Sequence, residues 1–262
     1  MLKTLFHGQL QLGLAQAAVA ALAALSVVLI AHRRGIHLEK ELAIAMARGL
    51  VQIVAVGSIL LLLLRGPSWT SVFLLLTMMV AAGATSARRA KGMPGAFQVS
   101  TWAIAGGAGS VIALMTLLGV IDTPITALVP VGSMLIANAM NTNGLVLNRF
   151  RSEVLAHVGE IETALALGAD GKSSIAPYVQ GSFEASLIPA IDSLRSLGIV
   201  WIPGLMAGMM LSGARPLYAA VYQFVVLAMI FAASGLTSLV STLLMRARVM
   251  SPAEQLILRP GQ

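Results

Sequence analysis

Seven apolar runs of about membrane-spanning length dominate this sequence and limit what it can fold into. They cover residues 9–31, 43–64, 69–87, 100–120, 125–147, 199–214 and 217–245. A helix that crosses a bilayer needs roughly 20 mostly apolar residues. Only 10% of the 262 residues are charged, against about 25% in soluble domains. We therefore expect an all-α polytopic membrane protein in which residues 1–262 form one transmembrane domain.

The sixth run is the least regular of the seven. It is short, and it contains Pro203, Gly204 and Gly208, residue types that interrupt or weaken helices. Two alternatives remain open for it. The span takes additional length from residues 186–198, or it is a broken helix.

Basic residues predict the orientation of the chain. With seven spans, 14 of the 17 Lys and Arg residues fall on one side, and Lys3, Arg65 and Arg215 remain for the other. Because cytoplasmic loops carry the excess of positive charge, the N-terminus is expected outside and the C-terminus in the cytoplasm. The first run also permits reading as a cleavable signal sequence, but its stronger basic cluster, His32 to Arg34, follows the run. Retention as an anchor is therefore favoured.

A phosphate-loop pattern occurs at residues 166–173, ALGADGKS. A working phosphate loop follows a buried strand and opens a helix. Here Val154, Val158, Ile161 and Leu165 precede it at helical spacing, and Gly168 suits a helix C-cap. We interpret the pattern as a chance match and expect no ATP hydrolysis by this chain.

The largest predicted cytoplasmic segment, residues 149–198, contains a second pattern. Glu162-Thr163-Ala164, followed by Gly168, resembles the Glu-Ala-Ala-x-x-x-Gly segment of ABC-transporter permeases, with Thr163 replacing the first Ala. In that family the segment is a coupling helix that docks on a separate ATPase subunit. The resemblance assigns ATPase coupling to Glu160, Glu162, Ala164, Gly168 and Ala169. A solvated amphipathic helix is the alternative.

Four separated stretches resemble the iron-export ABC permeases (FetB-like), which are related to plant permeases linked to aluminium tolerance. They are RGLVQ from Arg48, PVGSMLIANAMNTNGLVLNR from Pro130, ETALALGA from Glu162 and LIPAIDSLRSLGIVWIPGLMAG from Leu187. The stretches occur in the family's order and at similar spacing. Ser133, Arg195 and Leu205 depart from the family pattern, in which Gly, Lys and Met are usual.

This resemblance implies a permease subunit that works with a separate ABC ATPase, as two permeases plus two ATPases, in a bacterial inner membrane. It implies export of iron or another metal; a non-metal cargo such as a nucleotide sugar, and a membrane scaffold or sensor that binds an ATPase without transport, are the alternatives. It also marks gating or coupling candidates: Arg48, Asp192, Arg195, Pro203 and Gly204. No cofactor and no nucleic-acid partner is expected.

Polar side chains inside the runs supply candidates for the substrate pathway. Gln52, Asn138 and Asn141 are amides at membrane depth, and buried amides there must find partners. Interhelical hydrogen bonding is the alternative to a pathway lining. Met206 joins the candidates because thioethers bind soft metals, although Met also fills core gaps. Asp192 and Arg195 can pair on one helical turn.

Ionisable residues are nearly absent from the predicted spans. Proton- and sodium-driven carriers use such residues within the membrane, so their absence favours energy supplied by an ATPase partner. The sequence contains no cysteine, and the four histidines show no metal-ligand spacing. The identity of any bound metal stays unknown, and no catalytic constellation indicates a membrane enzyme.

Overall fold

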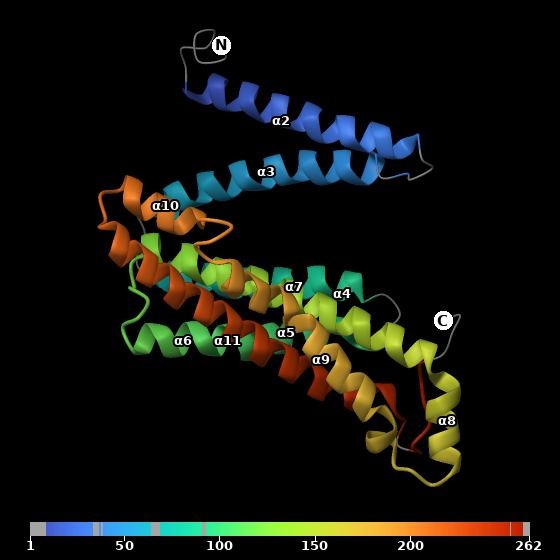
Figure 1. The fold of residues 1–262 in the computed structure, drawn as a ribbon. Coiled ribbons are helices and arrows are strands. Elements are labelled where there is room, and N and C mark those ends of the chain that lie inside the picture. Colours follow the sequence, from blue (N-terminus) through green and yellow to red (C-terminus); the bar gives the residue numbers. More distant parts are fainter. Residues whose placement is uncertain are drawn as a thin grey trace. The chain divides into compact units, whose positions relative to one another are not determined.

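The computed structural model describes residues 9–33, 37, 39–63, 69–90, 93–251 and 253–258. The chain divides into two compact units, Met1–Gly66 and Pro67–Gln262, which are shown together in Figure 1. Each unit is described by itself below. The prediction that the whole chain forms one domain stays a prediction.

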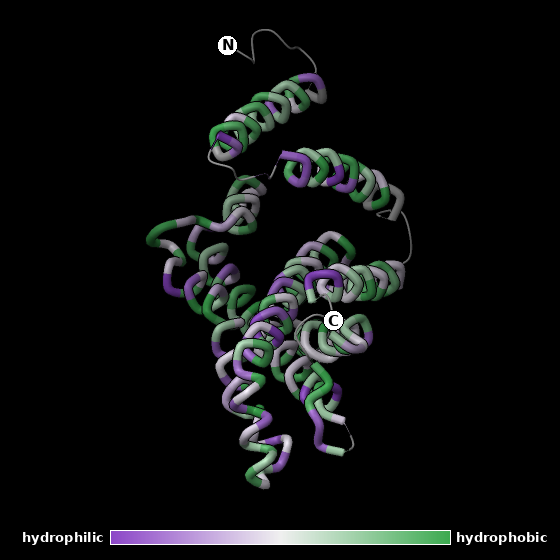
Figure 2. The backbone as a smooth tube through the Cα atoms, turned by 90° about the vertical axis from the view of Figure 1, so that its right-hand side faces the viewer, coloured by the Kyte–Doolittle hydropathy of each residue, from purple (hydrophilic) through white to green (hydrophobic). Residues whose placement is uncertain are grey.

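The first unit contains two helices, α2 (Gln9–His32) and α3 (Glu39–Leu63). Hydrophobic residues recur along both (Figure 2), and most of their described side chains are exposed. Helices that are apolar around their whole circumference are buried in protein or in lipid. The exposed apolar surface of α2 and α3 is therefore suited to a bilayer.

The second unit is also helical throughout its described residues. Its elements are α4 (Trp69–Arg89), α5 (Ala96–Ile104), the π-helix η1 (Ala105–Gly109), α6 (Ser110–Leu117), α7 (Ile125–Ala156), α8 (Val158–Ala166), α9 (Gly171–Ser196), α10 (Gly204–Leu211) and α11 (Pro216–Val249). Extended pairing among the described residues is limited to two isolated bridges. The predicted all-α class is confirmed.

Six helices of the described chain are long and apolar enough to cross a membrane, against about seven predicted. They are Gln11–Ile30, Glu39–Ile59, Trp69–Arg89, Ala96–Leu117, Ile125–Ala156 and Pro216–Val249. The prediction at 199–214 is corrected, because only α10, eight residues long, is α-helical there. Eight residues extend about 12 Å, too short for a bilayer core of about 30 Å. Of the two alternatives, the structure has the broken helix.

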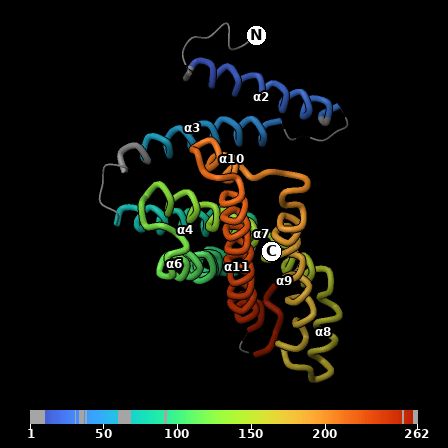
Figure 3. Tube along the Cα trace, turned by 60° about the vertical axis from the view of Figure 1, so that its left-hand side comes forward, coloured from blue at the N-terminus to red at the C-terminus, as the bar shows by residue number. Residues whose placement is uncertain are grey.

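Helix α9 was not predicted as part of the packed bundle. Glu184, Asp192 and Arg195 make it too polar to resemble a membrane span, yet it runs beside α7 and α11 (Figure 3). Small side chains permit this close packing: Ser186 is buried and lies 2.8 Å from Ser238 of α11. Residues 171–196 are thus one helix that extends from α8 to the break before α10.

Two apolar cores hold the second unit together. One joins α4, α5, η1, α6, α7 and α11 around Ile104, Leu135 and Val226. The other lies at the α8 end and contains Phe150, Val154, Ile161, Ile175 and Leu256, the last contributed by the chain that folds back after α11. A Cβ added at Gly107 of η1 would lie 2.7 Å from the Thr237 Cα atom, so η1 and α11 approach backbone to backbone.

Candidate functional site

A small cavity lies where α7, α9 and α11 meet the break between α9 and α10. Its volume is about 150 Å³ and its lining residues are Met134, Asn138, Ala190, Ser193, Trp201, Pro203, Gly204, Gln223, Leu227 and Ile230. None of these residues is ionisable. The cavity therefore offers neutral amide, hydroxyl and thioether groups, and it brings together three residues predicted for the site: Asn138, Pro203 and Gly204.

The break that forms one wall of this cavity has a clear local cause. Gly198 adopts a φ of 74°, a conformation that glycine reaches without strain, and its N–H donates to the Trp201 carbonyl at 3.1 Å. The Trp201 indole N–H donates to Ser196 Oγ, also at 3.1 Å. Pro203 then occupies the N-cap of α10, where its missing N–H does not weaken the helix.

Gln223 of α11 connects the cavity to the start of α10. Its side chain is only 1% exposed, and its Oε1 accepts a hydrogen bond from the Met206 backbone N–H at 3.2 Å. This bond satisfies one of the free N–H groups at the helix start. The Gln223 Nε2 atom is buried without a hydrogen-bond partner, although buried amides normally have one.

Three asparagines of α7 have different surroundings. Asn143 is buried and donates to Ser86 at 2.7 Å and Ser100 at 2.8 Å, so it ties α7 to α4 and α5. Asn138 and Asn141 are exposed. Asn138 donates to the Met134 carbonyl of its own helix, and Asn141 accepts from Arg89 of α4 at 3.1 Å. Interhelical bonding therefore accounts for Asn143 and Asn141, whereas Asn138 reaches the cavity.

The other predicted pathway and gating residues do not all converge. Asp192 and Arg195 lie 3.6 Å apart, which confirms the predicted pair, and both are largely exposed on α9. Met206 is bonded through its backbone to Gln223 but does not line the cavity. Arg48 and Gln52 lie on exposed positions of α3 in the first unit.

Helix α8 ends as the sequence predicted. Gly168 has a φ of 91°; its N–H donates to the Leu165 carbonyl, and the Ala169 N–H donates to Ala164, both at 3.0 Å. This pair of bonds is a Schellman C-cap. The phosphate-loop pattern therefore runs from the end of α8 to the start of α9, with no strand before it, so the structure supports a chance match.

The apolar stripe that runs from the end of α7 through α8 faces its own unit. Val154 and Ile161 are buried, and Val158 and Leu165 pack against the same core. Glu160 accepts a hydrogen bond from Tyr178 of α9 at 3.1 Å, and His157 stacks on the same ring. Burial and the bond to Glu160 raise the pKa of Tyr178. Glu160 thus fastens α8 to α9, although the sequence suggested contact with a partner.

The outward surface of α8 consists of other residues. Glu162 is exposed, and Leu167 is 84% exposed immediately before Gly168. Ala164 and Ala169 are half-buried. Sequence analysis did not single out Leu167, because it lies off the periodic stripe, but it is the large apolar side chain that α8 presents outward.

The sequence profile of one protein family, the Uncharacterised protein family (UPF0014), matches residues 14–250. The chain belongs to this family. Among its relatives, the rice "UPF0014 membrane protein STAR2" is 34% identical over 87% of this chain and 80% of its own length. The Arabidopsis thaliana "Protein ALUMINUM SENSITIVE 3" is 30% identical over 93% of this chain and 90% of the relative.

A third relative is the Escherichia coli (strain K12) "Probable iron export permease protein FetB". It is 29% identical over 92% of this chain and 93% of the relative. These relatives confirm the resemblance to FetB-like and plant aluminium-related permeases. No solved structure matches this chain.

One group of possible metal ligands in this UPF0014 protein was missed. His32, His37 and Glu39 have ligand atoms within 4.8 Å of one another, and the two Nδ1 atoms lie 3.2 Å apart. The spacing of the histidines along the chain did not indicate this grouping of His32 and His37. Two imidazoles and one carboxylate can hold a divalent cation. His7 lies outside the described residues.

We predict that Gln223→Leu lowers transport but leaves the stability of the protein nearly unchanged. The change removes the partner of the Met206 N–H but also removes the buried, unpartnered Nε2, so the free energy of unfolding should change by less than about 1 kcal/mol. The cavity loses its amide, and transport should fall about fivefold or more. Thermal unfolding and flux measured together test this. Gln180→Leu on the surface of α9 is the control, and equal flux in all three proteins contradicts the prediction.

Proposed function

We propose that this chain is the permease subunit of an ATP-driven metal exporter, with iron as the first cargo to test. A separate ABC ATPase supplies the energy, and the protein resides in a bacterial inner membrane. The observation that best supports this proposal is the neutral polar cavity at the broken α9–α10 segment. Transporters commonly place substrate sites at interrupted helices.

Family membership and the relatives' names support the cargo and the transport role. The FetB relative is named as a probable iron export permease. Asn138, Ser193 and Met134 give the cavity oxygen and sulfur donors without a carboxylate. A neutral donor set binds a divalent cation weakly, which favours passage over retention.

The absence of ionisable residues from the cavity lining supports an external energy source. In our proposal α8 docks on the ATPase and passes its movement to α9 through the Tyr178–Glu160 hydrogen bond. Helix α9 is about 39 Å long and ends at the cavity. Pro177 and Pro189 remove backbone hydrogen bonds within it, so it can bend during alternating access.

The proposal includes two permeases and two ATPases. Asn138 and Asn141 are exposed on α7, and Asp192 and Arg195 on α9. Polar groups at membrane depth face protein or a water-filled path and not lipid. A second permease, packed against α7 and α9, would enclose the pathway between the two copies.

Reconstitution tests the proposal. The chain is placed in vesicles with a candidate ABC ATPase from the same organism, and ATP hydrolysis and Fe²⁺ flux are measured. Iron-stimulated hydrolysis with flux is expected. If a nucleotide sugar stimulates hydrolysis and iron does not, the proposed cargo is wrong and a nucleotide sugar takes its place. If the ATPase binds but no cargo stimulates it, the chain is a scaffold.

The orientation gives a separate prediction. A cysteine at Asp122, in the exposed turn before α7, should react with an impermeant thiol reagent in intact cells. A cysteine at Ser173, near the start of α9, should react only after permeabilisation. Because the chain has no natural cysteine, labelling reports these sites alone. Reaction of the Ser173 variant in intact cells would reverse the orientation.

A further inference from the structure

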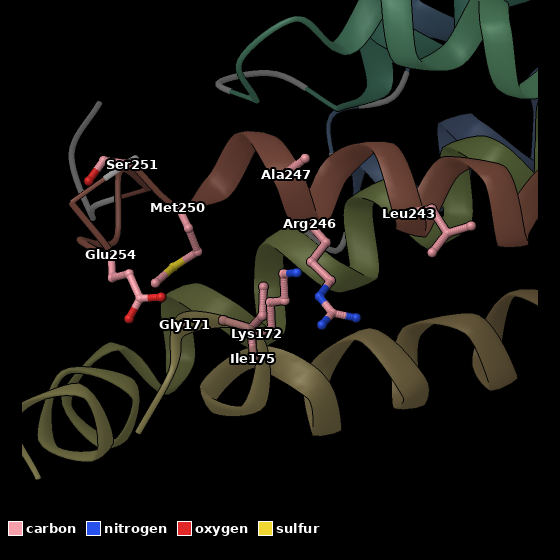
Figure 4. A pocket seen from close by; sticks show the side chains of 9 residues that line it. All are labelled: Gly171, Lys172, Ile175, Leu243, Arg246, Ala247, Met250, Ser251 and Glu254. Carbon is pink, nitrogen blue, oxygen red and sulfur yellow. The ribbon is translucent and has the colours of Figure 1, made fainter. Parts of the chain in front are cut away.

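A second, larger cavity lies at the N-terminal end of α9, away from the break. It has a volume of about 590 Å³ and lies between the first turn of α9, the last turns of α11 and the chain that follows (Figure 4). Its lining residues are Gly171, Lys172, Ile175, Leu243, Arg246, Ala247, Met250, Ser251 and Glu254. The transport proposal uses none of them.

Two cationic side chains, Lys172 and Arg246, enter this cavity (Figure 4). Neither forms an ion pair with a carboxylate of the described residues. The Arg246 Nε atom is buried and has no hydrogen-bond partner. A buried charged donor without a partner is costly, so the site is suited to an anion that accepts this N–H.

Two carboxylates, Glu254 and Asp170, lie near these cations. Glu254 lines the cavity and balances one of the two cations. Asp170 is the N-cap of α9, and hydrogen bonds from Ser173 keep its pKa below the usual value, with a smaller contribution from Arg246. The start of a 26-residue helix adds positive potential and free N–H groups. The four side-chain charges balance, so the helix start and the unpartnered Arg246 N–H are what favour an anion in this cavity.

The rest of the lining is apolar. Ile175 is buried in the wall, whereas Leu243 is 58% exposed at the cavity. Ala247 and Met250 complete this surface. A cationic centre beside an exposed apolar wall, at the end of membrane-length α11, matches an amphiphilic anion better than a fully water-soluble one.

We propose that this cavity binds the phosphate of an anionic membrane phospholipid. Lys172, Arg246 and the N–H groups at the start of α9 hold the phosphate, and Leu243 and Met250 contact the acyl chains. Basic pockets between membrane helices bind anionic headgroups in this way. The Gly171-Lys172 dipeptide of the phosphate-loop pattern thus meets a phosphate at a helix start without forming a nucleotide site. The inference does not depend on the transport proposal.

The test uses the purified full-length chain in mild detergent. Phosphatidylglycerol, phosphatidylcholine and inorganic phosphate are titrated separately, and affinity is followed through the thermal midpoint. We expect phosphatidylglycerol to raise the midpoint of the parent far more than the other two. The double variant Lys172→Gln/Arg246→Gln should bind it at least about tenfold more weakly, because it loses two charged hydrogen bonds to the phosphate.

Two further variants make the outcome specific. Ala247→Trp keeps both cations but fills the cavity, so it should also lose the phosphatidylglycerol effect. Arg149→Gln removes one charge from an exposed pair with Glu153 at 2.8 Å outside the cavity and should behave as the parent. Equal effects of the two lipids, or unchanged affinity in the double variant, overturn the proposal. If inorganic phosphate raises the midpoint as much as phosphatidylglycerol does, the ligand is a free phosphate ion and the lipid proposal is wrong. Neither ATPase nor cargo is present, so these outcomes leave the transport proposal untouched.

Discussion

Gly107→Ala is expected to destabilise the protein by about 1–3 kcal/mol, the usual cost of overpacking a close contact. A Cβ at this position would lie 2.5 Å from the Thr237 backbone N and 2.7 Å from its Cα. Backbone atoms cannot move aside as a side-chain end can, so η1 and α11 must separate. A lower thermal midpoint in detergent is the measurement.

The neighbouring glycine is a matched control for this change. At Gly106 the nearest atom to an added Cβ is Val240 Cγ2 at 3.8 Å, an ordinary contact. Gly106→Ala lies in the same π-helix and gains the same methyl group, so it should leave the midpoint near that of the parent. Equal destabilisation by the two changes would attribute the effect to the π-helix itself and not to its contact with α11.

Six of the spans could be predicted because each is a run of apolar residues near the length that a bilayer requires. Helix α9 could not be predicted in this way. Its contact with α11 depends on small buried hydroxyls such as Ser182 and Ser186, which satisfy their hydrogen bonds locally at 2.6 and 2.7 Å. A search for apolar runs counts these serines as polar. Their small size nevertheless allows the two helices to pack closely.

The cavity was predicted in part. Asn138, Pro203 and Gly204 were candidates, but their meeting depends on long-range packing that spacing along the chain does not contain. The sequence shows Gln223 as a polar residue within an apolar run. Its partner is the Met206 backbone N–H at 3.2 Å, and a pattern of side chains cannot predict a bond to a backbone group. The gating role of Arg48 and the pathway role of Gln52 remain predictions.

The exposed end of α8 gives the prediction with the largest expected effect on transport. In our proposal Glu162, Leu167 and Gly168 face the ATPase, since the periodic apolar stripe is already packed against the permease. A Cβ at Gly168 meets nothing within 4 Å. A large side chain there would therefore project outward, where it obstructs the partner without a clash inside this chain.

We expect Gly168→Trp to insert normally but to lose most ATPase co-purification and transport. Because the φ of Gly168 is 91°, any side chain introduces backbone strain of about 1–2 kcal/mol. Gly168→Ala is the matched control, since it carries this strain without the bulk and should retain more of the bound ATPase. Glu162→Lys should weaken association by about 0.5–2 kcal/mol, and more strongly at low salt, as expected for a charge at an interface rim. If Gly168→Trp and Glu162→Lys bind and drive the ATPase as the parent does, α8 is a solvated helix and the energy for transport enters elsewhere.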